Sequence, residues 1–279
     1  MGDVTRIIQA SDGRRLCVRD AGSHGSDAPL ALFWHHGTPG LGLAPRPLLT
    51  LADELGLRLI GHDRPGYGES DRLPGRRIGH VAADVADIAD ALGITRYAVM
   101  GYSGGGPHAL ACAAADPRVV ATIIGSGLAP RDADGLDWYG GMIASGCHVL
   151  TAAERGEQPR RAAEADGYDP EFNARDLAAL DGDWGWLGDV AGAFTPDDID
   201  GAIDDDLSYV CDWDVDLDAI AAPTLLIHGT ADGIVPIGHG RWMAERIGAE
   251  LWQKDGDGHV SAIEALPDAL RWLRTVVSD

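Results

Sequence analysis

Short, nearly continuous apolar runs recur along the chain and alternate with stretches of helical periodicity. Such runs are typical of strands that are buried on both faces of a sheet. The clearest are residues 30–34, 57–60, 97–100, 119–124 and 223–227. Because helix-like stretches separate them, the pattern predicts an α/β fold, with a mostly parallel sheet and helices on both of its faces.

Two local patterns refine this outline. Between the second and third runs, apolar residues recur at steps of three and four and so line one face of a helix: Ile78, Val81, Ala82, Val85, Ile88, Ala89 and Leu92. Gly93 follows as a typical helix stop. Near the start of the chain, residues 4–9 and 14–19 flank the turn Ser11-Asp12-Gly13 and predict an antiparallel hairpin.

The alternating rhythm stops between about residues 131 and 217. This stretch contains no clear buried strand, is rich in Asp, Gly and Ala, and has a helical, amphipathic pattern. The rhythm resumes at Pro223. We therefore predict that residues 131–217 are inserted between two strands of the sheet, and that residues 1–130 and 218–279 form the α/β core.

Composition and charge limit the partners of the protein. Hydrophobic residues make up 45% of the 279 residues, which is enough to bury a sizeable core. Asp and Glu total 44 against 22 Lys and Arg, so the formal net charge is −22. A field of that sign repels nucleic acid and anionic membrane surfaces. We therefore expect no nucleic-acid and no membrane partner, and leave a homodimer open.

Targeting signals and cysteine usage bear on location. We find no apolar stretch of about 18 residues and no basic start followed by an apolar run, so we predict neither a membrane span nor a secretory signal. The four cysteines are widely spaced and form no CxxC pair, which argues against a disulfide framework and against a zinc site. We therefore expect buried free thiols in a reducing cytoplasm.

The segment Gly101-Tyr102-Ser103-Gly104-Gly105 matches the G-x-S-x-G motif, with a strand-like run before it and a helix-prone segment after it. The turn from strand to helix is so tight that the residues two before and two after the serine must be small. It lifts the hydroxyl above the sheet edge, at a helix N-terminus. We therefore predict Ser103 as a nucleophile. Ser126 lacks the second flanking glycine and is interpreted as a loop residue.

A serine nucleophile needs a base within hydrogen-bond reach and an acid that holds this base in the right tautomer. His259 lies in a glycine-rich loop before an amphipathic C-terminal segment, and Asp232 closely follows a predicted strand. We predict His259 as the general base and Asp232 as the orienting acid. Asp132 is the rival acid, whereas Asp257 is too close to His259 in sequence to orient it easily.

Backbone N–H groups that stabilise an oxyanion are expected at two places. The segment His35-His36-Gly37-Thr38-Pro39-Gly40 follows the first buried run and can aim its N–H groups at the site above Ser103. The residue after the nucleophile supplies the second donor. We therefore predict the N–H groups of Thr38 and Gly104 as the oxyanion hole, with His36 holding its loop in place.

Together these motifs resemble those of the α/β-hydrolase superfamily, and the resemblance extends over nearly the whole chain. The matching pieces are residues 36–40, 63–70, 101–105, 229–236 and 258–259. The resemblance implies an eight-stranded sheet, a helical cap (lid) after the sixth strand, and no cofactor or metal.

Departures from individual groups within the superfamily narrow the reaction. Ser103 stands where haloalkane dehalogenases and epoxide hydrolases carry aspartate, which disfavours their chemistries. The loop around Thr38 is similar to that of prolyl iminopeptidases, which have a second glycine in place of Thr38. Gly104 replaces the tryptophan that follows their nucleophile, which argues against a peptidase.

The predicted function is a serine hydrolase that cleaves a small-molecule substrate, a small or medium ester or lactone, through an acyl-enzyme. Aromatic residues are the predicted walls of its pocket, with packing of the insertion onto the core as their alternative role: Tyr102, Trp138, Tyr139, Trp184, Trp186 and Trp213. Other activities stay open, namely carbon–carbon bond hydrolysis of ring-cleavage diketones, a prolyl iminopeptidase-type peptidase, a cofactor-free haloperoxidase-like activity, and a ligand-binding module with slow chemistry.

Overall fold

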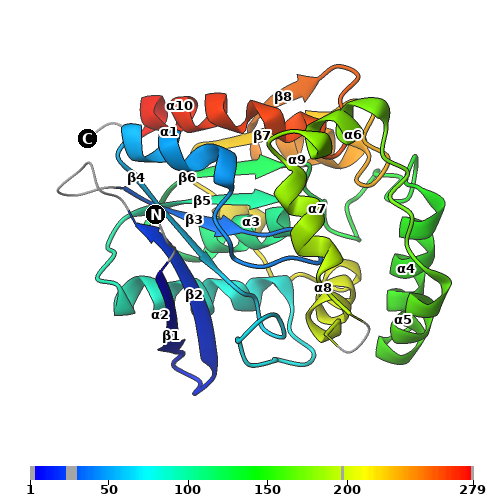
Figure 1. Cartoon of the computed structure of the whole chain (residues 1–279), viewed down its shortest axis with the longest axis horizontal. Coiled ribbons are helices and arrows are strands. Elements are labelled where there is room, and N and C mark those ends of the chain that lie inside the picture. Colours follow the sequence, from blue (N-terminus) through cyan, green and yellow to red (C-terminus); the bar gives the residue numbers. More distant parts are fainter. Residues whose placement is uncertain (1–3, 23–29, 196–197, 278–279) are drawn as a thin grey trace.

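An eight-stranded sheet forms the centre of the molecule (Figure 1). The computed structural model describes residues 4–22, 30–195 and 198–277. The strands are β1 (Val4–Gln9), β2 (Arg15–Gly22), β3 (Leu30–His35), β4 (Leu57–His62), β5 (Tyr97–Tyr102), β6 (Val119–Gly125), β7 (Thr224–Gly229) and β8 (Glu250–Lys254), in the spatial order β1-β2-β4-β3-β5-β6-β7-β8. Strand β2 is antiparallel to both of its neighbours and every other pair is parallel. The predicted fold class is confirmed.

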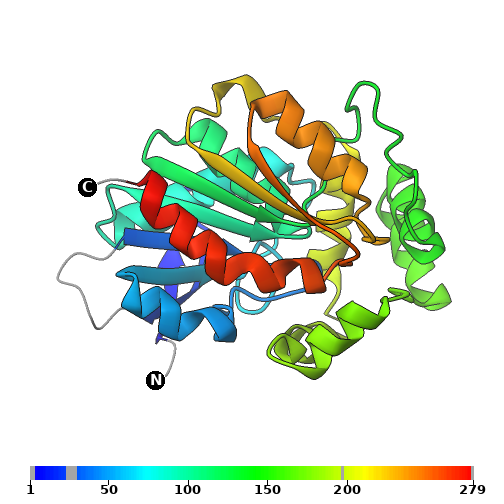
Figure 2. The same ribbon diagram turned by 90° about the horizontal axis from the view of Figure 1, so that it is seen from above.

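Helices cover both faces of the sheet (Figure 2). On one face lie α2 (Val81–Ala91), α3 (Gly105–Ala115) and α9 (Ile237–Ile247), whose apolar side chains share a core with strand residues such as Val99. On the other face α1 (Leu49–Glu54) and α10 (Leu266–Val276) share a second core with residues such as Met100. Because both faces are covered, every residue of β3, β5 and β7 is buried, which explains why their apolar runs are continuous.

The local patterns predicted at the N-terminal end have clear counterparts. A 3-10 turn (Ile78–His80) leads into α2, and Gly93 follows the helix with a φ of +68°, in the left-handed region that favours glycine. Strands β1 and β2 form the predicted hairpin, in which Gln9 pairs with Arg15. Strand β8 has no counterpart among the predicted runs because it is an edge strand that leaves Glu250 and Gln253 exposed.

Between β6 and β7, where the alternating pattern stops, the residues that the structure describes form five α-helices. They are α4 (Ala144–Glu154), α5 (Glu157–Ala163), α6 (Ala174–Asp181), α7 (Gly185–Gly192) and α8 (Asp200–Val210). Figure 1 shows them together on the right, at the end of the sheet where β5 runs into α3. Helix α4 packs against α5 and α8. The insertion therefore stands over the ends of the central strands.

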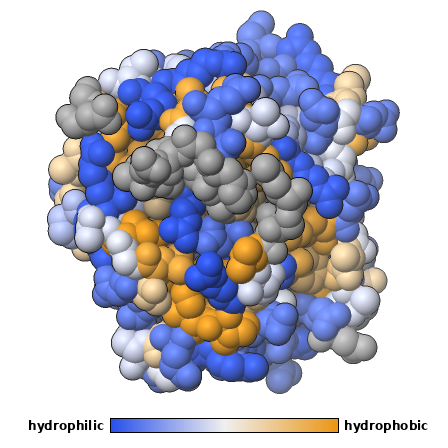
Figure 3. Space-filling view, turned by 60° about the vertical axis from the view of Figure 1, so that its left-hand side comes forward, coloured by the Kyte–Doolittle hydropathy of each residue, from blue (hydrophilic) through white to orange (hydrophobic). Residues whose placement is uncertain are grey.

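One face of the molecule is mainly polar. Figure 3 shows that hydrophilic residues predominate on this face and that apolar residues gather in its lower half. Within the described ranges, no helix is long and apolar enough to cross a membrane. All four cysteines are free thiols; Cys17 and Cys112 are buried as predicted, whereas Cys147 is partly exposed and Cys211 is exposed, which corrects the prediction for these two.

Candidate active site

Ser103 lies at a sharp turn between β5 and α3. Its φ is +53°, a strained value for a residue with a side chain. A Cβ on Gly101 would collide with the backbone oxygen of Gly105, and one on Gly105 would collide with the backbone oxygen of His35. The two flanking positions therefore accept only glycine, as the motif requires. The turn holds the Ser103 hydroxyl out at the N-terminus of α3.

The structure brings together the three residues predicted to act with one another. His259 Nε2 lies 2.9 Å from Ser103 Oγ, and His259 Nδ1 lies 2.8 Å from Asp232 Oδ2. His259 and Asp232 are each 5% exposed, whereas Ser103 is partly exposed. This chain of contacts is the arrangement that allows a histidine to take the proton of a serine hydroxyl.

Asp232 is held as a carboxylate. Its Oδ1 accepts hydrogen bonds from the backbone N–H groups of Ile234 and Val235, both at 2.9 Å. Burial by itself would raise the pKa of Asp232, but the adjacent His259 and these hydrogen bonds hold the pKa below its ordinary value. An ionised Asp232 keeps the proton of His259 on Nδ1, so that Nε2 faces Ser103 as an acceptor.

The alternative candidates for the acid and the nucleophile lie elsewhere or have other contacts. Asp132 is exposed, and Asp257 pairs with Arg175 at 2.6 Å. Ser126 is fully buried and donates a hydrogen bond to the backbone oxygen of His259 at 3.1 Å. Ser126 therefore supports the histidine loop rather than reacting.

The two predicted oxyanion donors lie beside the nucleophile. A Cβ on Gly37 would lie 3.5 Å from the Ser103 Cβ, and one on Gly104 would lie 2.6 Å from the Thr38 hydroxyl oxygen. Within the described ranges, the backbone N–H groups of Thr38 and Gly104 donate no hydrogen bond. Both groups are therefore free to bind a developing negative charge.

The orientation of the Thr38 N–H follows from the other side of its peptide bond. The backbone oxygen of Gly37 lies 2.7 Å from His36 Nδ1 and accepts a hydrogen bond from Arg64 at 3.2 Å. In a trans peptide the C=O and the following N–H point in opposite directions. Anchoring the Gly37 oxygen to His36 and Arg64 thus turns the Thr38 N–H away from them. His36 holds the loop, as predicted.

A buried carboxylate from the insertion holds the same loop, and sequence reasoning missed it. Asp205 on α8 accepts a hydrogen bond from the Thr38 hydroxyl at 2.7 Å and pairs with Arg64 and Arg76, each at 2.6 Å. Burial opposes its charge, but the two guanidinium groups hold the pKa of Asp205 well below its ordinary value. No motif marks Asp205; residues 63–70, which contain Arg64, were recognised only as part of the resemblance.

Tyr209, one helical turn further along α8, completes this contact. Its hydroxyl lies 2.6 Å from Thr38 Oγ1 and 3.1 Å from the backbone oxygen of Gly104. The Tyr209 hydroxyl has a single hydrogen, which it donates to the backbone oxygen of Gly104. A Cβ on Gly104 would collide with this phenol. Tyr209 therefore occupies the space that a larger residue after the nucleophile would need.

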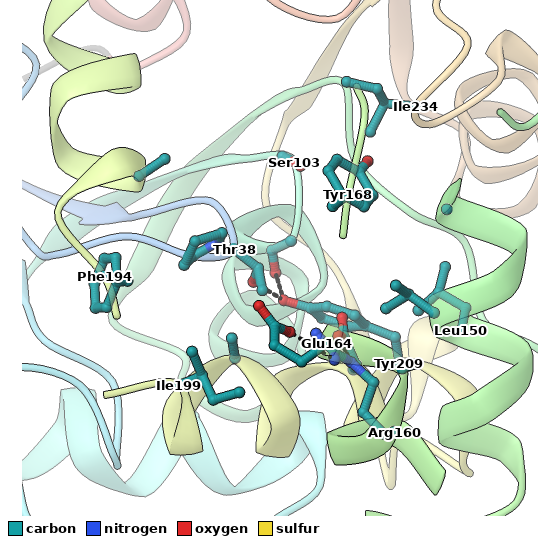
Figure 4. A pocket seen from close by; sticks show the side chains of 18 of the residues that line it. Thr38, Ser103, Leu150, Arg160, Glu164, Tyr168, Phe194, Ile199, Tyr209 and Ile234 are labelled. Carbon is teal, nitrogen blue, oxygen red and sulfur yellow. Dashed lines mark hydrogen bonds and ion pairs between the residues drawn. The ribbon is translucent and has the colours of Figure 1, made fainter. Parts of the chain in front are cut away.

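Two adjoining cavities meet at Ser103. The first, of about 330 Å³, is lined by Gly104, Arg160 and apolar residues of the insertion; we call it the Arg160 cavity (Figure 4). The second, of about 240 Å³, is lined by His259, Trp34 and other mainly apolar residues; we call it the His259 cavity. The residues shared by the two cavities are Thr38, Pro39, Ser103, Tyr168, Ala191 and Ile234. Ser103 thus borders both cavities.

The predicted aromatic walls are only partly found there. Tyr102 and Trp186 line the His259 cavity. The remaining predicted residues line neither cavity, which corrects the prediction: Trp138, Tyr139, Trp184 and Trp213. Apolar residues without aromatic rings, such as Val149 and Leu150, form much of the Arg160 cavity instead.

The aromatic residues that line neither cavity are packed elsewhere in the protein. Trp138 contacts the His239 ring at a centroid distance of 5.1 Å and donates a hydrogen bond from Nε1 to the backbone oxygen of Ala129 at 2.9 Å. Trp213 donates to the backbone oxygen of Tyr209 at 3.3 Å. A buried indole gains most where its ring is enclosed and its N–H is satisfied. Trp138 therefore joins the insertion to the core, the alternative role of these aromatics, whereas the hydrogen bond of Trp213 lies within the insertion.

Across residues 4–22, 30–195 and 198–277, no group of three or more His, Cys, Asp or Glu side chains is arranged to hold a metal ion.

Comparisons with known proteins identify the family. The sequence model of the α/β-hydrolase fold matches residues 31–266, and the chain belongs to this family. A non-heme chloroperoxidase of Streptomyces lividans is 29% identical over 254 residues, which cover 85% of this chain and 84% of that protein.

Solved structures show the same fold. An enol-lactonase from Burkholderia xenovorans has a TM-score of 0.74 at 20% identity and covers 98% of this chain and 100% of its own. An esterase from Thermogutta terrifontis has a TM-score of 0.70 at 22% identity, with 99% and 100% covered. At these identities the likeness shows the fold and carries no substrate with it.

Proposed function

We propose that this member of the α/β-hydrolase family is a serine hydrolase that cleaves a small or medium ester or lactone through an acyl-enzyme. Ser103 is the nucleophile, His259 the general base, and Asp232 the acid that orients the histidine. One observation carries the proposal: the hydroxyl of Ser103 lies 2.9 Å from His259 Nε2 at the junction of two cavities.

The first half-reaction forms the acyl-enzyme. His259 Nε2 takes the hydroxyl proton as Ser103 Oγ bonds to the carbonyl carbon, and the N–H groups of Thr38 and Gly104 bind the oxyanion. His259 then gives the proton to the leaving oxygen as the carbon–oxygen bond of the ester breaks. Asp232 stays ionised and stabilises the imidazolium in between.

The second half-reaction regenerates the serine. His259 takes a proton from water as the water oxygen bonds to the acyl carbon. The bond from that carbon to Ser103 Oγ then breaks, and His259 returns the proton to the serine. A carboxylic acid is released.

The placement of His259 indicates which cavity takes which part of the substrate. The leaving oxygen must face His259 Nε2 to receive its proton, and His259 lines only one of the two cavities. The leaving group therefore belongs in the His259 cavity and the acyl group in the Arg160 cavity. Residues 131–217, which supply much of both walls, act in this proposal as a cap over the core formed by residues 1–130 and 218–279.

The test is hydrolysis of a panel of p-nitrophenyl esters and lactones by the wild type and by Ser103→Ala. We expect Ser103→Ala to lose at least roughly a thousandfold in turnover. Ser145→Ala is the matched control, since its hydroxyl donates to the backbone oxygen of Asp169 and lines neither cavity. A fluorophosphonate should label the wild type at Ser103, as read by mass spectrometry. Equal turnover in wild type and Ser103→Ala, or no adduct at Ser103, refutes the assignment.

A second candidate is supported by the names of two relatives. The Streptomyces lividans protein is a non-heme chloroperoxidase, and a protein of Acinetobacter calcoaceticus that is 32% identical over 100 residues is a bifunctional esterase/perhydrolase. In such a reaction hydrogen peroxide would replace water in the second half-reaction and release a peracid, which oxidises halide. Halogenation of monochlorodimedone with acetate, peroxide and bromide, lost in Ser103→Ala, would support it.

A further inference from the structure

Three charged side chains stand in the otherwise mainly apolar wall of the Arg160 cavity. Arg160 comes from α5, Glu164 from the 3-10 turn that follows it, and Asp206 from α8. Figure 4 shows Ser103 at the top of this cavity and Arg160 at its bottom, with Leu150 along one side. Arg160, which pairs with both carboxylates, therefore lies at the end of the cavity away from the nucleophile.

Two of these charges are deeply buried. Arg160 is 6% exposed and Asp206 is 7% exposed. Buried charges are unfavourable unless they are paired. Arg160 Nε donates a hydrogen bond to Asp206 Oδ2 at 2.6 Å, and its Nη1 donates to Glu164 Oε2 at 3.0 Å. These contacts join α5 to α8, but they use only some of the hydrogen-bond donors and acceptors of the three side chains.

Part of the hydrogen-bonding capacity of these two cavity-lining residues is unused. No described residue donates a hydrogen bond to Asp206 Oδ1, and Arg160 Nη2 donates none to any described residue. A guanidinium has five N–H donors and a carboxylate accepts on both of its oxygens. Burial raises the pKa of Asp206 to about 6 in spite of the adjacent Arg160, as expected for a carboxylate that is short of donors.

The charge balance at this end selects the ligand. Asp206 and Glu164 carry two negative charges against the one positive charge of Arg160 when all three are ionised. Arg64 and Arg76, which pair with Asp205, do not line this cavity. A hydrogen-bond donor is therefore favoured here, and a carboxylate is repelled.

We propose that Arg160, Asp206 and Glu164 form a recognition site for a hydroxyl or amino group at the far end of the substrate's acyl chain; this rests on the acyl-enzyme function proposed above. The group donates to Asp206 Oδ1, and a hydroxyl can also accept from Arg160 Nη2. The chain between the ester carbonyl and this group lies against apolar residues such as Leu150 and Phe194.

The experiment compares p-nitrophenyl esters from butanoate to octanoate, each in a plain, an ω-hydroxy, an ω-amino and an ω-carboxy form. The leaving group is the same throughout, so differences in kcat/KM report on the acyl chain. At the best chain length, the hydroxy and amino esters should exceed the plain ester by about tenfold or more, which is the effect of a hydrogen bond to a charged group. The carboxy ester should be the poorest substrate.

Isosteric variants separate recognition from folding. The readout is the ratio of kcat/KM for the amino ester to that for the plain ester, because a general loss of folded protein lowers both values and leaves the ratio unchanged. Asp206→Asn should bring this ratio down by about tenfold. Glu164→Gln, at an exposed position, should lower the ratio less and serves if Asp206→Asn does not fold. Asp183→Asn, at an exposed aspartate of the insertion that lines neither cavity, should keep the wild-type ratio.

The outcomes distinguish this proposal from the one on which it rests. Ser103-dependent hydrolysis with equal rates for all chain ends, or with a preference for the carboxy ester, overturns the recognition site and leaves the hydrolase intact. If no ester is hydrolysed, the proposed function fails. Binding of hexylamine and hexanoate, measured by calorimetry on the wild type and on Asp206→Asn, then decides the site. Tighter binding of the amine, lost in the variant, supports it, and any other result overturns it.

Discussion

The carboxylate of Asp176 accepts a hydrogen bond from the backbone N–H of His259 at 3.1 Å. Its other oxygen accepts from the N–H groups of Val260 and Ser261 and from the Ser261 hydroxyl, at 2.8 to 3.0 Å. Asp176 lies on α6 of the insertion and is 3% exposed. One buried carboxylate of the insertion thus holds the histidine loop.

Asp205 has the same role as Asp176 at the loop that contains Thr38, whose hydroxyl it binds. The two carboxylates come from different helices of the insertion, α6 and α8, and each binds a core loop that approaches Ser103. The insertion therefore does more than line the cavities, because it is also hydrogen-bonded to both loops around the nucleophile.

We predict that Asp176→Asn lowers kcat by about ten- to a hundredfold. Asparagine has the same shape but only one accepting oxygen. Its NH₂ group must therefore face a backbone N–H that donates a hydrogen bond to a carboxylate oxygen in the wild type. The unpaired groups should lower the free energy of unfolding by about 1–3 kcal/mol. Ester hydrolysis and thermal unfolding measure the two effects.

Asp257→Asn is the matched control for this experiment, since it removes a carboxylate from the same loop. Asp257 pairs with Arg175, whose side chain is 58% exposed, and a pair of this kind contributes little. Activity near that of the wild type is expected. If Asp176→Asn behaves like this control, Asp176 does not position His259.

We predict that Asp205→Asn is strongly destabilised. The change leaves Arg64 and Arg76 buried without their anionic partner, which costs about 3–5 kcal/mol. Urea unfolding at neutral pH measures it. Asp200→Asn removes an exposed carboxylate of the same helix and should change the free energy of unfolding by less than about 1 kcal/mol. Equal stability of the two variants would contradict the assigned pairing.

The ion pairs of Asp205 with Arg64 and Arg76 predict how the free energy of unfolding depends on pH. Asp205 has a pKa well below its ordinary value in the folded protein, whereas in the unfolded chain the pKa is about 3.9. Between these two values the unfolded chain binds the additional proton, so the stabilisation is present in full above the unfolded value and is lost as the pH falls through the folded pKa. The stability difference between the wild type and Asp205→Asn should therefore shrink on acidification below about pH 4. Urea titrations in acid check this, and a difference that grows would contradict it.

We predict that Gly104→Ala lowers kcat by at least about tenfold. The new methyl group would overlap the Tyr209 hydroxyl and lie 2.6 Å from Thr38 Oγ1, so Thr38 or Gly104 must move out of the oxyanion site. Loss of one such donor costs about a hundredfold or more. Gly192→Ala, where a Cβ meets nothing within 4 Å, is the control and should keep wild-type activity. Equal kcat in both variants would show that the Gly104 N–H is not an oxyanion donor.

We predict that the two classes of buried tryptophan respond differently. Trp138→Ala should lose about 3–5 kcal/mol of stability, because Trp138 fills the joint between insertion and core, while the preference among leaving groups stays the same. Trp186→Ala should enlarge the His259 cavity and shift relative kcat/KM severalfold toward bulkier leaving groups. A panel of alkyl and aryl esters with one acyl group measures the preference. A shift in Trp138→Ala but not in Trp186→Ala would reverse the assignment of the two residues.

The sequence by itself determined the core architecture and the three residues Ser103, His259 and Asp232, which contact one another in that order. Strands covered on both faces must be apolar throughout, so their runs are visible in a single chain. The turn at Ser103 imposes steric demands on Gly101 and Gly105 within five consecutive residues, and such a demand leaves a readable motif. Asp232 closely follows a predicted strand, and His259 lies in a glycine-rich loop before the amphipathic C-terminal segment.

Only the tertiary structure decided the walls of the cavities and the partners of the two loops. Asp176, Asp205 and Asp206 look in the sequence like any other aspartates of an acidic, helical stretch, because a helix allows polar residues on most of its surface. Whether such a carboxylate meets Arg64, Arg160 or a backbone N–H depends on how each helix of the insertion rotates and docks on the core. That docking is set by packing between residues far apart in the chain, and packing of this kind leaves no local pattern.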